Sequence, residues 1–146
     1  MKYISTEKKT PPVSFAEAAL QGLAPDGGLY LPDHWPQLQD QFWKDIDHKT
    51  LPEIGFGMSR LFVDELDGSV LQNILNKAIN FDAPLVELGN GIHILELFHG
   101  PTLAFKDFGA RFMSRVFSAL REESDEDLVI LAATSGDTGS AVAQGF

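Results

Sequence analysis

The stretch FKDFGARFMSRVFSAL (residues 105–120), followed by DLVILAAT (127–134) and SGDTGSAVAQGF (135–146), decides the fold class. Apolar residues recur in the first segment at three- and four-residue intervals, which predicts a helix over about 107–121. The second segment is a continuous apolar run, typical of a buried strand, and the third predicts another helix. This alternation indicates an α/β protein with a parallel sheet. Three arginines are expected on the other faces of the first helix: Arg111, Arg115 and Arg121.

The sequence before this stretch predicts mainly helices. Ser14 and Glu17 have capping-box spacing, which predicts a helix over about 14–21. A turn at Pro25–Gly28 precedes a short strand at 29–31, and residues 32–47 read as an irregular connection with one helical turn.

Two further helices and a hairpin are predicted up to residue 98. Thr50 and Glu53 repeat the capping-box spacing at the start of a helix over about 51–66. The runs LVELG (85–89) and GIHILELF (91–98) meet at Asn90–Gly91, which favours a hairpin turn with positive backbone angles. An apolar stripe predicts a helix over 69–80 and core positions at Val70, Leu71, Ile74, Leu75, Ala78 and Ile79.

The domain organisation follows from these elements. We expect a helix-rich domain over residues 1–83 and the start of a sheet domain over 84–146. A parallel sheet is buried on both faces by helices and contains several strands, more than this sequence predicts. We therefore expect the chain to be an amino-terminal fragment of a longer one, or to need another chain to complete its fold.

Composition excludes several classes of function. The 146 residues include no cysteine, so disulfides, thiolate metal sites and thiol nucleophiles are excluded. A net charge of −10 disfavours nucleic-acid and membrane partners, and the absence of a signal or spanning segment leads us to expect a cytoplasmic location. No histidine pair has metal-ligand spacing. The acidic residues at 122–127 read as a solvated loop rather than a cation site.

Lys106 lies where an irregular stretch enters the predicted helix, with Leu103, Ala104, Phe105 and Phe108 around it. An amine among apolar groups loses hydration of its charged form, which favours the neutral amine that attacks an aldehyde. The alternative is a surface lysine whose stem lies on phenylalanine while the ammonium stays in water. The residues alone leave both interpretations open.

A second candidate segment, ATSGDTGS (133–140), follows the predicted buried strand and precedes a helix. Ligands usually bind at the carboxyl ends of strands in α/β sheets, and a glycine-bearing helix start offers backbone donors to an anion. An ordinary Ser, Asp or Thr helix cap explains the same residues. The spacing matches neither a P-loop nor G-x-G-x-x-G, so nucleotide binding is disfavoured.

Two blocks in this order, ELFHGPTLAFKDFGARF (96–112) and ATSGDTGSAVA (133–143), closely resemble the threonine synthase family. These are pyridoxal phosphate (PLP) enzymes of the tryptophan synthase β-like fold, also called fold type II. VSFAEAALQGLAPDGGLYLP (13–32) is similar to the family's amino-terminal domain, whereas residues 33–84 match in pattern more than in motif. Members often carry arginine and glycine just after the early Ser-Thr, where this chain has Glu7-Lys8-Lys9-Thr10, so no role is assigned to that stretch.

The resemblance implies specific roles. Lys106 would form a Schiff base with pyridoxal 5'-phosphate and act in catalysis, and Phe105 and Asp137 would lie at the cofactor. A carboxylate near the cofactor's phenolic oxygen is repulsive unless one partner is protonated, so the role of Asp137 stays open. The substrate O-phosphohomoserine would be bound by Ser135, Gly136, Thr138 and His99.

The implied reaction uses water to give L-threonine and phosphate, the last step of threonine biosynthesis. The cofactor's phosphate cup and the partner of its pyridine nitrogen would lie beyond residue 146. Two alternatives remain. One is a related phospho-lyase that stops at elimination and releases 2-oxobutyrate. The other is a non-catalytic fragment that binds a partner and no cofactor.

Overall fold

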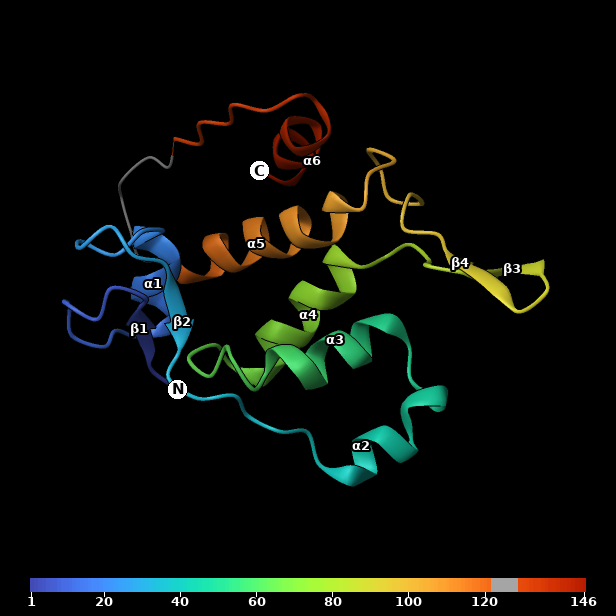
Figure 1. The fold of residues 1–146 in the computed structure, drawn as a ribbon, viewed down its shortest axis with the longest axis horizontal. Helices are drawn as coiled ribbons and strands as arrows, with labels where there is room; N and C mark the ends of the chain where they lie inside the picture. Colours follow the sequence, from blue (N-terminus) through green and yellow to red (C-terminus); the bar gives the residue numbers. More distant parts are fainter. Residues whose placement is uncertain (122–128) are drawn as a thin grey trace. The chain divides into compact units, whose positions relative to one another are not determined.

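The computed structural model describes residues 1–121 and 129–146, which form two compact units, Met1–Gln72 and Asn73–Phe146 (Figure 1). Six α-helices and two antiparallel strand pairs make up the described residues. The described residues are therefore of mixed α/β class, as predicted, but both of their sheets are antiparallel and the predicted parallel sheet is not seen in them. The domain boundary between residues 83 and 84 stays a prediction.

A two-stranded sheet opens the first unit. Strand β1 (Tyr3–Ser5) pairs antiparallel with β2 (Tyr30–Pro32), so that Tyr3 lies opposite Pro32. The turn before β2 is closed by the Gly27 amide, which donates to the Ala24 carbonyl at 2.8 Å, and Gly27 has a φ of 84°. A positive φ at this position is adopted readily by glycine. The predicted turn and strand are both confirmed, with the strand one residue further on.

The capping box predicted at Ser14 is present at the start of α1 (Phe15–Gln21). The Ser14 amide donates to Glu17 Oε2 at 2.8 Å, and the Glu17 amide donates to Ser14 Oγ at 3.1 Å. The predicted irregular connection contains α2 (Asp40–Lys44) and a short 3₁₀ helix over Ile46–His48.

Helix α3 (Leu51–Ser59) begins where predicted but ends earlier than residue 66. Beyond it the chain turns, which buries Val63 and Leu66, and the Arg60 side chain donates to the Leu66 carbonyl. The predicted extension of this helix to residue 66 is therefore wrong, and the chain beyond Ser59 turns and bends instead.

Asp26 organises the loop that follows β1. Its carboxylate accepts hydrogen bonds from Ser5 Oγ at 2.6 Å, the Gly28 amide at 3.1 Å, the Lys9 amide at 3.0 Å and Thr10 Oγ1 at 3.4 Å. The Ser5 hydroxyl, followed by the backbone amides, holds the pKa of Asp26 below its usual value of 3.8. The folded chain therefore favours the ionised form of this carboxyl.

This predicts acid sensitivity in the first unit. The lowered pKa means that the stabilisation is present above the unfolded value of about 4 and is lost as the pH falls through the folded value. We expect the urea midpoint of the chain to depend less steeply on pH below about 4 after Asp26→Asn than before it. Asp82→Asn, at an exposed aspartate, is the control. Equal pH dependence in all three proteins would contradict the role given to Asp26.

Helix α4 (Gly68–Ala78) carries the predicted apolar stripe. Four of its six positions are buried, namely Leu71, Ile74, Leu75 and Ala78, while Ile79 is half-buried and Val70 is 40% exposed. The stripe is thus confirmed except at its first residue, which lies in the first turn of the helix.

In the second unit, β3 (Leu85–Gly89) and β4 (Ile92–Leu95) form the predicted hairpin. Asn90 and Gly91, which connect the strands, have φ values of 53° and 75°. These positive angles are the ones that an Asn-Gly turn requires, so the hairpin prediction is confirmed.

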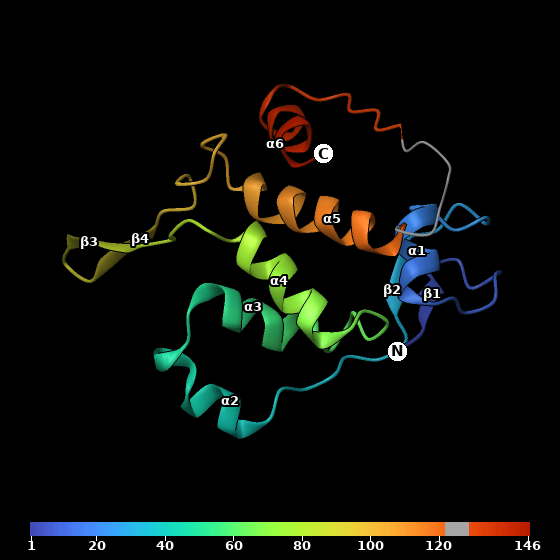
Figure 2. The same cartoon turned by 180° about the vertical axis from the view of Figure 1, so that it is seen from behind.

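Helices α5 (Lys106–Leu120) and α6 (Asp137–Gly145) pack side by side, as Figures 1 and 2 show from opposite directions. Their contact is close at Gly145, where a Cβ atom would lie 3.0 Å from the Ala110 carbonyl oxygen and 3.2 Å from Ser114 Oγ. Ala141, one helical turn earlier, is fully buried. Small residues on α6 therefore allow the approach of the two helices.

The predicted buried strand over 127–134 is wrong for its described part. Residues 129–134 form no strand and are exposed, with Val129 at 75% and Leu131 at 92%. A parallel strand is buried by neighbouring strands and by helices on both faces, and the described residues supply no such strand. The acidic residues at 122–127 lie outside the described residues, as does Leu128.

Two other features bear on the sequence analysis. Arg111, expected on a face of its helix other than the apolar stripe, is 5% exposed, a burial that the sequence did not predict. Among the described residues, no helix is long and apolar enough to cross a membrane.

Candidate functional site

The loop before α5 is held by Asp107. This side chain is fully buried and accepts hydrogen bonds from the Thr102 amide at 2.9 Å and from Thr102 Oγ1 at 2.6 Å. Between them the chain passes through Leu103, whose φ is 58°, and the Leu103 amide donates to the Gly100 carbonyl at 3.0 Å. Asp107 thus fixes the loop that leads into the lysine.

Lys106 is the first residue of α5 and is half-buried. Its Nζ lies 4.3 Å from the centroid of the Phe105 ring, a distance at which an ammonium is attracted to an aromatic face. Phe105 is itself 60% exposed, and Leu103 is 74% exposed. The apolar neighbours expected from the sequence therefore lie beside the lysine without enclosing it.

The loop before α6 is shaped by Thr134. Its Oγ1 accepts hydrogen bonds from the Gly136 amide at 2.9 Å and from the Gly139 amide at 3.0 Å. Gly136, the N-cap residue of α6, has a φ of 139°, which only glycine adopts readily. Thr134 is the hydroxyl cap that the sequence analysis kept as an alternative, but at a residue that it did not single out.

A groove of about 470 Å³ brings part of the predicted site together. Lys106 and Phe105 line it from α5 and the loop before it, and Thr138 lines it from α6. The rest of the lining is apolar, formed by Phe108, Gly109, Ala110, Met113 and Val142. We call this space the α5/α6 groove. Its volume falls in the range of small-molecule sites.

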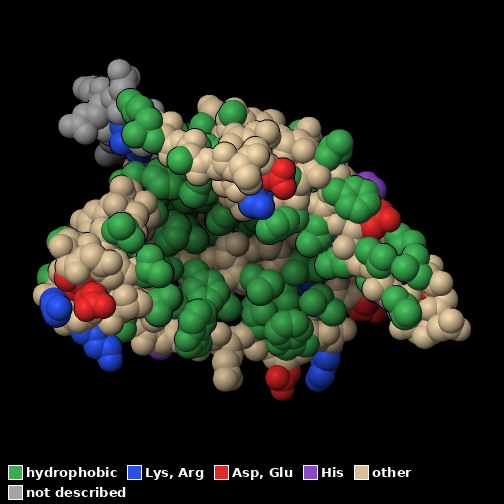
Figure 3. Space-filling view, turned by 45° about the horizontal axis from the view of Figure 1, so that its top comes forward, with side chains coloured by type: hydrophobic (Ala, Val, Ile, Leu, Met, Phe, Trp, Pro, Cys, Tyr) green, Lys and Arg blue, Asp and Glu red, His purple; other side chains and the backbone are tan. Residues whose placement is uncertain are grey.

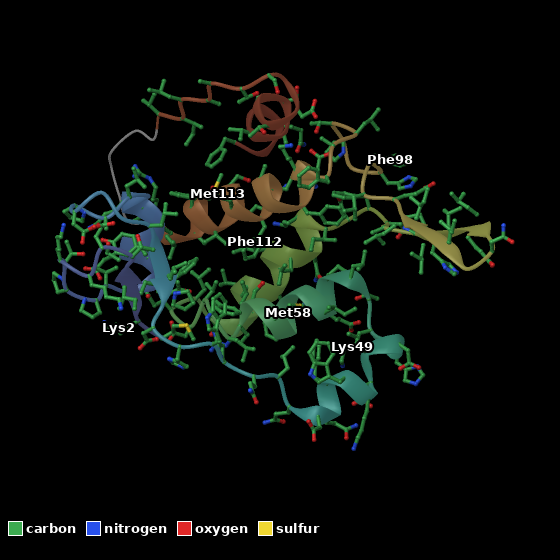
Figure 4. All side chains as sticks on the ribbon, in the orientation of Figure 1. Lys2, Lys49, Met58, Phe98, Phe112 and Met113 are labelled. Atoms are coloured by element: carbon green, nitrogen blue, oxygen red, sulfur yellow. The ribbon has the colours of Figure 1, made fainter. Side chains whose placement is uncertain are left out.

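A second hollow of about 340 Å³ shares Met113, Thr138 and Val142 with the α5/α6 groove. Figure 4 shows Met113 on α5, on the side of the helix that faces α6. The second hollow is lined on its other side by residues 130–134. The two spaces therefore follow one another along the contact between the helices.

The other predicted site residues lie outside the lining of the groove. Ser135, Gly136 and Asp137 are exposed in the loop that begins α6. His99 Nε2 lies 2.7 Å from Glu96 Oε2, and its ring is stacked on Phe98, with the ring centroids 4.8 Å apart. Figure 4 shows Phe98 in the segment after β4. Glu96 was not predicted from the sequence.

Other sites are not supported within the described part of the chain. No group of three or more His, Asp or Glu residues there could hold a metal ion. A groove of about 430 Å³ in the first unit, lined by Trp43, Met58 and Phe62 among others, contains none of the predicted site residues.

Comparison with known proteins gives the family. Residues 2–79 match the family model described as "Threonine synthase N terminus". Threonine synthase of Buchnera aphidicola is 40% identical over 148 aligned residues, which cover 100% of this chain and 34% of that protein. Threonine synthase of Haemophilus influenzae is 44% identical, with 92% and 31% covered.

Solved structures agree in fold. A PLP-bound threonine synthase from Brucella melitensis matches with a TM-score of 0.93 at 36% identity, covering 100% of this chain and 33% of that one. Threonine synthase from Escherichia coli matches with a TM-score of 0.91 at 37% identity, covering 100% and 34%. The chain belongs to the threonine synthase family and corresponds to the amino-terminal region of its members. It spans about one third of the length of these relatives.

Proposed function

We propose that this chain is the amino-terminal part of a threonine synthase, which converts O-phospho-L-homoserine and water to L-threonine and phosphate. Lys106 is the residue that binds pyridoxal 5'-phosphate. The observation that carries this proposal is the α5/α6 groove, in which Lys106 from one helix and Thr138 from the next line a single space of about 470 Å³.

The residues of the groove fit the aldehyde end of the cofactor. Among the described residues, Lys106 is the one amine that lines the groove, and the surrounding side chains offer apolar contact to an aromatic ring. When bound, pyridoxal phosphate supplies an electron sink for a substrate carbanion. The cup for its phosphate is expected in the two thirds of the family fold that this chain does not match.

The chain's own side chains then have distinct tasks. The Lys106 amine would hold the cofactor and would carry protons to and from the substrate's Cα and Cβ atoms. Phe105 and Asp107 hold this lysine at the start of α5, through the ring contact and the buried hydrogen bonds to Thr102. They position the amine and do not react.

The loop before α6 binds the substrate's α-carboxylate in this proposal. The Gly136 and Gly139 amides donate to Thr134, so the amides of Asp137 and Thr138 are the donors left to meet an anion at the first turn of the helix. Ser135 adds a hydroxyl group to this proposed site. His99 adds an imidazole ring, which is oriented by its hydrogen bond with Glu96. The Asp137 carboxylate opposes an anion unless it is protonated, so it is the least favourable member of the loop.

Covalent capture of the cofactor tests the proposal. The purified chain is incubated with pyridoxal phosphate, reduced with borohydride and mapped by mass spectrometry. We expect the pyridoxyl group on Lys106 in preference to Lys44, an exposed lysine of α2, because the groove adds ring contacts that an exposed lysine lacks. Lys106→Arg is the control, in which the preference should vanish. Labelling spread evenly over both lysines would count against the assignment.

A further inference from the structure

Arg111 is a buried arginine that no carboxylate neutralises among the described residues. It lies on α5, five residues after Lys106, and is 5% exposed. Its guanidinium donates four hydrogen bonds, which go to the Ala78 carbonyl at 2.8 Å, the Lys77 carbonyl at 2.8 Å, Asn80 Oδ1 at 2.9 Å and Gln144 Oε1 at 3.0 Å. All four acceptors are neutral oxygen atoms.

Two of these bonds cap the end of α4. The last carbonyls of a helix have no partner within the helix and carry the negative end of its dipole. Arg111 supplies a permanent cation and two donors at this point, where α4 ends at Ala78. Its Cζ also lies 5.7 Å from the centroid of the Phe81 ring, which packs on Phe108 at 4.8 Å. The guanidinium is thereby fixed in one orientation.

The fourth bond reaches the helix that carries the other half of the groove. Gln144 is on α6, and Gly145 beside it brings α6 close to the Ala110 carbonyl. Lys106 starts α5, and Thr138 lies in the first turn of α6. Arg111 therefore links α5, the helix that begins with Lys106, to α6. Arg111 itself does not line the α5/α6 groove.

We propose that Arg111 is a positioning residue: by bonding the end of α4 and Gln144 at once, it sets the approach of α5 and α6 that brings Lys106 and Thr138 into one groove. The inference rests on the proposed function for the meaning of that groove. It adds a residue that touches neither substrate nor cofactor.

Capture of pyridoxal phosphate by the chain gives the first readout. We expect Arg111→Met to lower the ratio of Lys106 labelling to Lys44 labelling by about tenfold, the size of effect expected when one hydrogen bond to a charged group is lost. Gln144→Leu removes only the bond to α6 and should act in the same direction. Gln144→Glu places a carboxylate opposite Arg111, which preserves the bond, so it should keep the original ratio.

Arg115→Met is the matched control. Arg115 is on the same helix, one turn later, and its Nη1 donates to the Arg111 carbonyl at 2.9 Å. This substitution removes an arginine whose hydrogen bond stays within α5, so the labelling ratio should not change. The Leu and Glu variants of Gln144 keep the test valid even if Arg111→Met fails to fold, which far-UV circular dichroism and urea unfolding would reveal.

Amide hydrogen exchange of residues 136–139 gives a second readout that needs no cofactor. If Arg111 positions α6, exchange there should be faster in Arg111→Met and Gln144→Leu than in Arg115→Met. If the variants show this change in exchange but the chain does not label Lys106 in preference to Lys44, the proposed function is contradicted. The positioning role of Arg111 is then still supported. A preference for Lys106, combined with folded Arg111 and Gln144 variants that change neither readout, would overturn the inference.

Discussion

Replacing Lys106 with alanine is expected to lower threonine formation by about 10³-fold, within the range for removing one positioned proton-transfer group. The measurement uses a chimera in which residues 1–146 replace the matching third of Escherichia coli threonine synthase, which has the same fold over this region. The expected loss is large because the proposal gives Lys106 two tasks, binding the cofactor and moving protons. Its place at the start of α5, in the α5/α6 groove, suits both.

Two controls accompany this prediction. Lys77→Ala removes an exposed lysine of α4 and should leave the rate unchanged. A small primary amine added to the Lys106→Ala chimera should restore part of the activity, because it can take over proton transfer in a groove that is still formed. A Lys106→Ala chimera with the unsubstituted rate would show that another residue does this chemistry. Release of 2-oxobutyrate instead of threonine by the unsubstituted chimera would favour the phospho-lyase alternative.

Gly100→Ala is expected to destabilise the second unit by about 2–3 kcal/mol, which is within the usual cost of overpacking. A Cβ atom at this position would lie 2.4 Å from Asp107 Oδ2 and 2.7 Å from Asp107 Cβ. Asp107 is fully buried and can move away only by weakening its hydrogen bonds to Thr102. Urea unfolding followed by circular dichroism measures the effect, and capture of pyridoxal phosphate at Lys106 should fall with it.

Gly109→Ala provides a comparison of opposite sign. Gly109 is inside α5, and a Cβ atom there would meet no heavy atom within 4 Å. Alanine is favoured over glycine in a helix interior by roughly 0.5–1 kcal/mol, so this variant should be more stable than the original chain. If Gly100→Ala proved as stable as Gly109→Ala, the close approach at Asp107 would not constrain the loop.

The elements predicted correctly from the sequence are those whose conformation is determined by residues close to one another in the chain. Ser14 and Glu17 satisfy one another's backbone within one turn, and Asn90–Gly91 adopts the positive angles that its residue types allow. The end of α3 at Ser59 was not predicted, because the residue spacing gives no sign of the turning segment that contains the buried Val63 and Leu66. The run at 129–134 has a strand's composition, but composition shows a preference for burial and not the presence of partners.

In the candidate site too, features set by local sequence were predicted and features set by contacts between helices were not. The motifs identified Lys106 and Thr138, but their meeting in one groove depends on the approach of α5 and α6, which sequence spacing does not show. The burial of Arg111 was not predicted, because arginine is rarely buried and the neutral oxygen atoms that it bonds lie on other elements. A threonine two residues before a glycine was an available signal for Thr134, since hydroxyl side chains often bond to amides two residues further along.

The exposed run at 129–131 has a consequence for handling the chain by itself. Apolar side chains are visible over much of the face in Figure 3. Val129 and Leu131, at 75% and 92% exposed, are among the most exposed large apolar side chains of the described residues. In the described structure residues 129–131 belong to no strand. An exposed segment of β-branched and aliphatic residues is a template for pairing with a second copy. The net charge of −10 opposes such pairing by repulsion, and dissolved salt screens that repulsion. Self-association of the isolated chain should therefore increase with ionic strength as well as with concentration.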